Sequence, residues 1–127
     1  EGDDATRFSL MPSFGRDGLL SSDDIEGRTH YVLRVSGQDF DAGLADGVEE
    51  LYQQQCATCH GVNAEGARLQ GAPNLTDQEW LYGSTEDAIY NTIYNARNSH
   101  MPAWQDRLDD ASIKALAVYV HTLGGGE

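Results

Sequence analysis

The stretch Cys56-Ala57-Thr58-Cys59-His60 decides how the rest of this sequence is interpreted. Its two cysteines are the only ones in the chain. Cysteines at i and i+3 on a helix end lie one turn apart on the same face. That spacing matches the two vinyl groups on one side of a haem, so we predict thioether bonds through Cys56 and Cys59. The adjacent His60 is then the expected proximal ligand of the iron.

Two other uses of a Cys-x-x-Cys pair remain alternatives to haem attachment. Half of a zinc site would need two more ligands at paired spacing, and only the scattered His30, His100 and His121 remain. A thioredoxin-like redox pair belongs beside alternating strands and helices, a pattern that this sequence lacks. Both alternatives fit less well than one covalently attached haem c.

Met101 is the predicted sixth ligand, on the opposite face of the haem from His60. It follows His60 by 41 residues, which is far enough for the chain to cross to the other face. Its soft thioether sulfur favours ferrous iron, and Pro102 stiffens the backbone that presents it. His100 is the rival ligand, and a lone methionine can also be a core filler.

Four further residues are candidates for contacts around the haem. Pro73 follows His60 by 13 residues, and its carbonyl is placed to accept a hydrogen bond from His60 Nδ1–H. The side chains of Trp80, Tyr82 and Arg97 offer N–H, O–H and guanidinium donors for the haem propionates. Each of these three is otherwise an ordinary residue at the edge of the core.

Hydrophobic periodicity predicts an all-α fold with three main helices, over 45–58, 85–97 and 110–123. The glycine-rich stretch 61–83 has little periodicity, which indicates an ordered loop. A loop of this length in a compact domain usually encloses a functional site. In the second helix, Ser84 is the expected N-cap. Its expected inner face consists of Ile89, Ile93 and Ala96. The expected inner face of the third helix consists of Ile113, Leu116, Ala117, Val120 and Leu123.

An internal repeat links the two ends of the chain. The run Met11-Pro12-Ser13-Phe14 matches Met101-Pro102-Ala103-Trp104, and Ile25…Tyr31-Val32…Gly37 then matches Ile113…Tyr119-Val120…Gly125. Residues 11–37 therefore resemble the last third of a second copy of the same module.

The N-terminal copy has drifted from the C-terminal one. Arg28 and Thr29 stand where the C-terminal copy has Leu116 and Ala117, so we do not expect the N-terminal helix to line a haem core. The predicted organisation has three parts: the remnant 1–40, a linker 41–46 and a haem-binding domain 47–127. The remnant is expected to pack against the haem domain as a helical appendage or to join two chains in a dimer.

The charge balance excludes several classes of partner. The chain has 21 acidic and 8 basic residues and a net charge of −13, so nucleic acid and anionic membranes are not expected partners. No run approaches the roughly 18 apolar residues needed to cross a bilayer, and we expect no membrane contact by these residues themselves. The acidity fits either a docking face for a basic redox protein or solvation in a saline environment.

Residues 47–126 resemble class I cytochromes c. They are most similar to the second haem domain of CcoP, the dihaem subunit of cbb-type haem–copper cytochrome c oxidases, and the run 11–20 resembles the end of its first haem domain. The stretches that carry the resemblance are Cys56–Gly61, Gly71–Thr76, Trp80–Gly83, Asn95–Asn98, Met101–Trp104 and Ile113–Gly126.

The resemblance implies a fold, a function and a location. It implies a class I cytochrome c fold, with three helices around one haem c, that transfers one electron without being an enzyme itself. The implied partners are a donor cytochrome and the oxidase core subunits of a respiratory chain, and the implied location is the periplasm. The alternatives are a freestanding periplasmic monohaem shuttle and, less well supported, a peroxidase or gas-binding haem protein.

Overall fold

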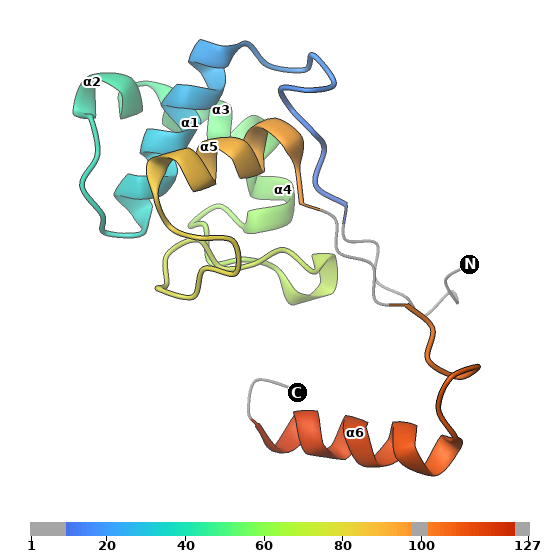
Figure 1. Cartoon of the computed structure of the whole chain (residues 1–127). Coiled ribbons are helices and arrows are strands. Elements are labelled where there is room, and N and C mark those ends of the chain that lie inside the picture. The colour runs from blue at the N-terminus through green and yellow to red at the C-terminus, as the bar shows by residue number, and fades with distance from the viewer. Residues whose placement is uncertain (1–9, 98–101, 124–127) are drawn as a thin grey trace.

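The computed structural model describes residues 10–97 and 102–123 and confirms the all-α class (Figure 1). Within these ranges the only extended pairing is an isolated bridge between Ala67 and Ala72. None of the helices found there is long and apolar enough to cross a membrane. The helices are α1 (Ser22–Val35), α2 (Ala42–Ala45), α3 (Val48–Gln55), α4 (Ala57–His60), the 3-10 helix η1 (Arg68–Gln70), α5 (Glu86–Asn95) and α6 (Asp110–Thr122).

The predicted helix 45–58 is divided in the structure. Helix α3 ends and α4 begins at Cys56, while α2 lies within the predicted linker 41–46. Asp41 begins α2, because its carboxylate accepts hydrogen bonds from the N–H groups of Gly43 and Leu44. The chain between α1 and α3 is therefore folded back on itself and includes a short helix.

The predicted helix 85–97 corresponds to α5, with two corrections at its ends. Thr85, not Ser84, is the N-cap, and its hydroxyl accepts a hydrogen bond from Ala88 N–H. Ala96 ends the helix with a φ of 55°, so it does not lie on the inner face. Ile89 and Ile93 do face inward and are buried, as predicted.

Helix α1 begins at a capping box. The Ser21 hydroxyl accepts a hydrogen bond from Asp24 N–H at 3.1 Å, and the Asp24 carboxylate accepts one from Ser21 N–H at 3.2 Å. These hydrogen bonds from Ser21 lower the pKa of Asp24. The helix ends at Ser36, and Gly37 follows with a positive φ of 75°, a conformation that glycine adopts without strain.

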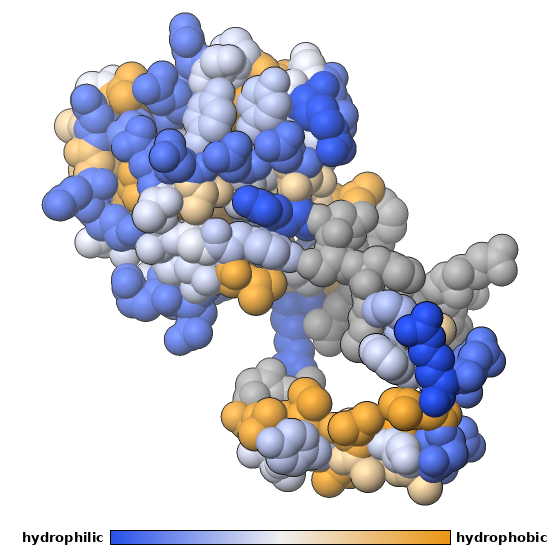
Figure 2. All heavy atoms as spheres, viewed as in Figure 1, coloured by the Kyte–Doolittle hydropathy of each residue, from blue (hydrophilic) through white to orange (hydrophobic). Residues whose placement is uncertain are grey.

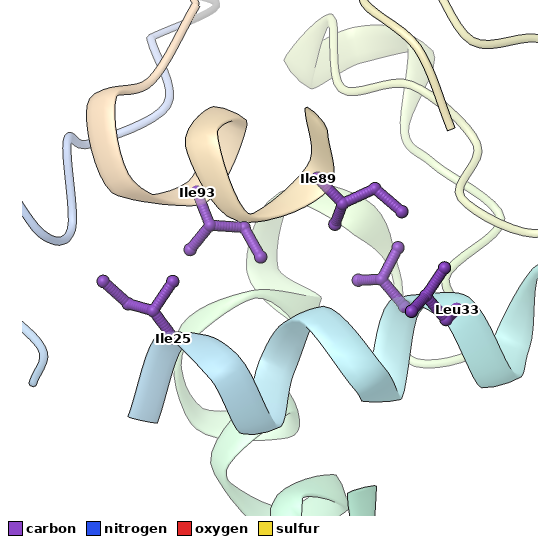
Figure 3. Close-up of a cluster of buried hydrophobic side chains, with 5 residues drawn as sticks. Ile25, Leu33, Ile89 and Ile93 are labelled. Carbon is purple, nitrogen blue, oxygen red and sulfur yellow. The ribbon is translucent and has the colours of Figure 1, made fainter. Parts of the chain in front are cut away.

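Helix α1 packs against α2, α3 and α5 and forms the centre of the molecule. Figure 3 shows Ile25 and Leu33 of α1 pointing toward Ile89 and Ile93 of α5. A second cluster joins α1 to α3 and the following loop, and in it the rings of Tyr31 and Tyr52 stack at 4.7 Å. The members of this second cluster are Tyr31, Val48, Tyr52 and Ala64.

The third long helix of this packed unit is α1 and not 110–123, which the sequence assigned to that position. Helix α6 lies apart from the others in Figure 1 and has no buried residue. Its apolar side chains gather on the surface in Figure 2, with Leu116 50% and Val120 60% exposed. Helix α1 is buried in this unit even at Arg28 and Thr29, and the expectation that it lines no haem core stays a prediction.

Two glycines of the N-terminal copy explain why α1 fits this position. A Cβ atom on Gly27 would come within 3.1 Å of both Leu44 O and the Val48 side chain, and one on Gly15 would overlap the ring of Tyr94. The equivalent residues of the C-terminal copy are Ala115 and Gln105. The close approach of α1 to α2 and α3, and of the segment before α1 to α5, therefore suits the N-terminal copy better.

Val32 and Val120 provide a matched test, because they are equivalent in the repeat but 7% and 60% exposed. Val32→Ala should lower the free energy of unfolding of the haem-loaded chain by about 2 kcal/mol, since it removes buried methyl groups. Val120→Ala should change it by less than about 0.5 kcal/mol. Denaturant titration of both variants checks this, and a larger effect at Val120 would mean that α6 occupies the central position.

Candidate haem attachment site

The two cysteines lie at the junction of α3 and α4. The N–H groups of Cys59 and His60 donate hydrogen bonds to Cys56 O at 3.1 and 2.9 Å, which closes one helical turn across the motif. Both thiols are free, with Cys56 partly buried and Cys59 exposed. The motif therefore presents two sulfurs one turn apart, as its spacing predicts.

The His60 ring is held by the loop that follows it. His60 Nδ1 lies 3.0 Å from Pro73 O, the contact expected from their separation of 13 residues. A carbonyl oxygen only accepts hydrogen bonds, so this contact places the proton on Nδ1 and leaves the lone pair on Nε2. Burial lowers the pKa of His60, and the hydrogen bond to Pro73 opposes that shift. A neutral imidazole in this tautomer is the form that binds iron.

Hydrogen bonds fix the loop that carries Pro73. Gly66 N–H donates to His60 O at 2.7 Å, and Leu75 N–H donates to Ala64 O at 2.8 Å. The Tyr52 hydroxyl donates to Gly61 O at 3.0 Å and connects the loop to the core. The Pro73 carbonyl is thus held in place by contacts on both sides of it.

Gly66 brings two parts of this loop close together. Its φ is +79°, and a Cβ atom there would lie 2.7 Å from Asn74 N and 2.8 Å from the carbonyl carbon of Pro73. Only glycine fits that position without displacing the His60 acceptor. Gly66 lies in the glycine-rich stretch 61–83, but the requirement for glycine at this position shows only when the neighbouring backbone is known.

Trp80, Tyr82 and Arg97 differ in how well the structure defines their contacts. The Trp80 ring packs against the core, and its indole nitrogen is buried without a hydrogen-bond partner in the described structure. The guanidinium of Arg97 lies over the Tyr82 ring, 5.0 Å from its centre. Arg97 and Tyr82 are therefore in contact, and Trp80 holds an unused donor.

The expected far-side ligand, Met101, and its rival His100 lie outside the described residues. The equivalent residue of the N-terminal copy, Met11, is described and packs against the central apolar cluster. Its segment is bonded to the end of α5, since the N–H groups of Phe14 and Gly15 donate to Ile93 O and Tyr94 O.

The residues present suit a covalently attached haem. Two free thiols one turn apart and an imidazole with its lone pair on Nε2 are the donor set that haem c requires. The unpartnered Trp80 N–H would be satisfied by an acceptor such as a carboxylate. Within residues 10–97 and 102–123, no group of three or more His, Cys, Asp or Glu side chains is arranged to hold a metal ion by itself.

Comparison with known proteins identifies the family. A family model described as cytochrome C oxidase, cbb3-type, subunit III matches residues 43–120, which is more than half of the chain. The chain belongs to this family. The resemblance to CcoP that the sequence motifs indicated is thereby confirmed.

Curated relatives of this cbb3-type family match nearly the whole chain. The CcoP subunit of Cereibacter sphaeroides is 50% identical over 98% of this chain and 43% of its own length. CcoP of Azospirillum sp. strain B510 is 47% identical over 92% of this chain and 41% of its own length. FixP of Bradyrhizobium sp. strain ORS 278 is 46% identical over 99% of this chain and 44% of its own length. The chain thus spans less than half the length of these relatives.

Gly66→Ala tests whether the loop positions the Pro73 carbonyl, and Gly18→Ala is its matched control. Both glycines have a positive φ, but nothing lies within 4 Å of a Cβ atom on Gly18. We expect Gly18→Ala to lower the free energy of unfolding by roughly 1 kcal/mol and Gly66→Ala by roughly 3 kcal/mol, because the latter adds a backbone collision. Denaturant titration of the haem-loaded variants measures both, and equal losses would contradict this account of the loop.

Proposed function

We propose that this chain carries one haem c, bonded through Cys56 and Cys59 with His60 as proximal ligand, and transfers single electrons. The observation that carries the proposal is the motif turn together with the 3.0 Å contact between His60 Nδ1 and Pro73 O. The contact orients the imidazole and strengthens it as an electron donor to iron. When bound, haem supplies the one-electron redox couple.

The far-side ligand in this proposal is the sulfur of Met101. A thioether ligand favours ferrous iron and suits a carrier that works at a relatively high potential. His100 and Met11 are the competing ligands, and Met11 draws support from the packing of its segment on α5. With both axial positions held by side chains, the chain would take up and release an electron without binding a substrate at the iron.

Several side chains would orient the haem without reacting. We propose that Trp80 N–H and the Tyr82 and Arg97 donors face the propionates, since the Trp80 donor is buried without a partner. The stacked Arg97 and Tyr82 would hold each other in place at the edge of the site. These contacts replace water around the haem and keep the rearrangement that accompanies electron transfer small.

The partners and the location follow from the relatives. The names of the relatives mark them as subunits of cbb3-type oxidases, so we propose that this chain passes electrons from a donor cytochrome toward oxidase core subunits in the periplasm. A net charge of −13 would attract a basic donor. A dimer through residues 1–40 stays a prediction. Helix α1 buries its apolar face within its own chain, so that face is not available to a second chain.

Haem attachment is tested by expressing the chain where haem c is assembled and measuring its intact mass. We expect one added haem that survives denaturation and acid extraction, because thioether bonds are covalent. Cys56→Ala and Cys59→Ala should each make the haem extractable or leave it attached by one bond only. Thr58→Ala, at an exposed position between them, is the matched control and should retain the full mass.

The far-side ligand is tested by the oxidised absorption spectra of Met101→Ala, His100→Ala and Met11→Ala beside the wild type. We expect the sulfur-to-iron charge-transfer band to disappear only in Met101→Ala. Persistence of the band in that variant together with its loss in Met11→Ala would assign the ligand to Met11. Rapid, stoichiometric binding of carbon monoxide by the wild type at neutral pH would contradict the six-coordinate carrier and favour a gas-binding protein.

A further inference from the structure

Arg28 is a buried cation in the middle of α1. The residue is 2% exposed, and its hydrogen bonds are to uncharged acceptors. Nη1 donates to the Asp24 carbonyl at 2.8 Å and Nη2 donates to Gln55 Oε1 at 2.7 Å. The third donor, Nε, is buried without a hydrogen-bond partner in the described structure. The arginine is thus bonded on two sides and unsatisfied on the third.

The nearest carboxylate compensates this charge only weakly. Asp24 Oδ1 lies 3.9 Å from Nη1, its side chain is 45% exposed, and the same carboxylate already accepts hydrogen bonds from Ser21. A buried cation with an incomplete set of partners destabilises a fold compared with an apolar side chain of similar size. The C-terminal copy of this helix has such an apolar residue, Leu116, at the equivalent position. Stability therefore does not explain Arg28.

The position of Arg28 relative to the haem motif offers another explanation. Gln55, which accepts one of its hydrogen bonds, directly precedes Cys56, and Cys56 belongs to the cluster that α1 and α3 share. Burial raises the pKa of the Cys56 thiol, while the charge of Arg28 and a hydrogen bond from it act in the opposite direction. Arg28 is therefore hydrogen-bonded to the residue that directly precedes Cys56, through which a haem would be attached.

We propose that Arg28 raises the reduction potential of the haem attached at Cys56. Reduction adds one electron and so removes one positive charge from the site, and a nearby cation stabilises the reduced form relative to the oxidised form. The effect is strong where the cation is shielded from water, as Arg28 is, and the one carboxylate within 4 Å of it, that of Asp24, is itself 45% exposed. This inference rests on the proposed function and adds a residue that sets its potential.

Arg34 provides the matched control on the same helix. Its side chain is 33% exposed, lies 3.8 Å from the Glu49 carboxylate and stacks over the Tyr31 ring at 4.8 Å. Each arginine has one carboxylate at 3.8 to 3.9 Å, so removing Arg34 takes the same charge from α1, but that charge is screened by solvent. The two arginines thus separate the effect of a buried charge from the effect of net charge.

The test is a spectroscopic redox titration of the haem-loaded chain in its wild-type, Arg28→Leu, Arg28→Lys and Arg34→Leu forms, at low and high salt. Arg28→Leu should shift the midpoint potential downward by several times the shift of Arg34→Leu. The Arg28→Leu shift should persist at high salt, whereas the shift of an exposed charge fades. Arg28→Lys should restore most of the wild-type potential, because it keeps the charge.

Gln55→Glu tests the proposal without disturbing α1, in case Arg28→Leu does not fold. The substitution replaces the amide nitrogen by oxygen and places a carboxylate against Arg28 Nη2, so the buried charge gains a closer anionic partner than Asp24 and the potential should fall. Gln54 is exposed as Gln55 is but bonds to Glu50 instead of Arg28, so Gln54→Glu adds the same charge and should shift the potential less.

The outcomes separate this proposal from the one on which it rests. A wild-type chain without covalent haem, or without a reversible one-electron couple, overturns both. A reversible wild-type couple that Arg28→Leu and Gln55→Glu leave unchanged, or shift no more than their controls, overturns the role of Arg28 alone. Failure of Arg28→Lys to recover the potential would show that Arg28 acts through packing and not through charge.

Discussion

The burial of α1 between α5 and α3 is the contact on which the rest of the structure depends. On one side, Ile25 of α1 packs against Ile93 of α5 in the central apolar cluster. On the other, Tyr31 stacks on Tyr52, and the Tyr52 hydroxyl holds the carbonyl of Gly61 directly after the haem motif. The Tyr31–Tyr52 pair thus connects α1 to the loop that holds the His60 ring.

The chemistry of the candidate site could be predicted from the sequence because it is local. The separation of Cys56, Cys59 and His60 is set by one helical turn, and the contact with Pro73 spans a short loop. The three helical segments were also visible, since each has a regular apolar stripe. Met101 and His100 lie outside the described residues, so the far-side ligand stays a prediction.

What could not be predicted depends on contacts between distant segments. Val32 and Val120 stand in the same pattern, and periodicity does not say which copy of the helix is buried. The choice depends on close approaches such as that of Gly27 to Leu44 O, which require the neighbouring backbone to be known. Arg28 looked like drift for the same reason, although the break in the apolar stripe was a signal that the position differs.

The separation of α6 from the packed unit has a consequence for how this chain responds to dilution. Helix α6 follows α5 in the same chain, so the two elements stay close to one another however dilute the protein is. Any competition between α6 and α1 for the surface that α1 covers within one chain is therefore unimolecular, and its balance does not depend on the protein concentration.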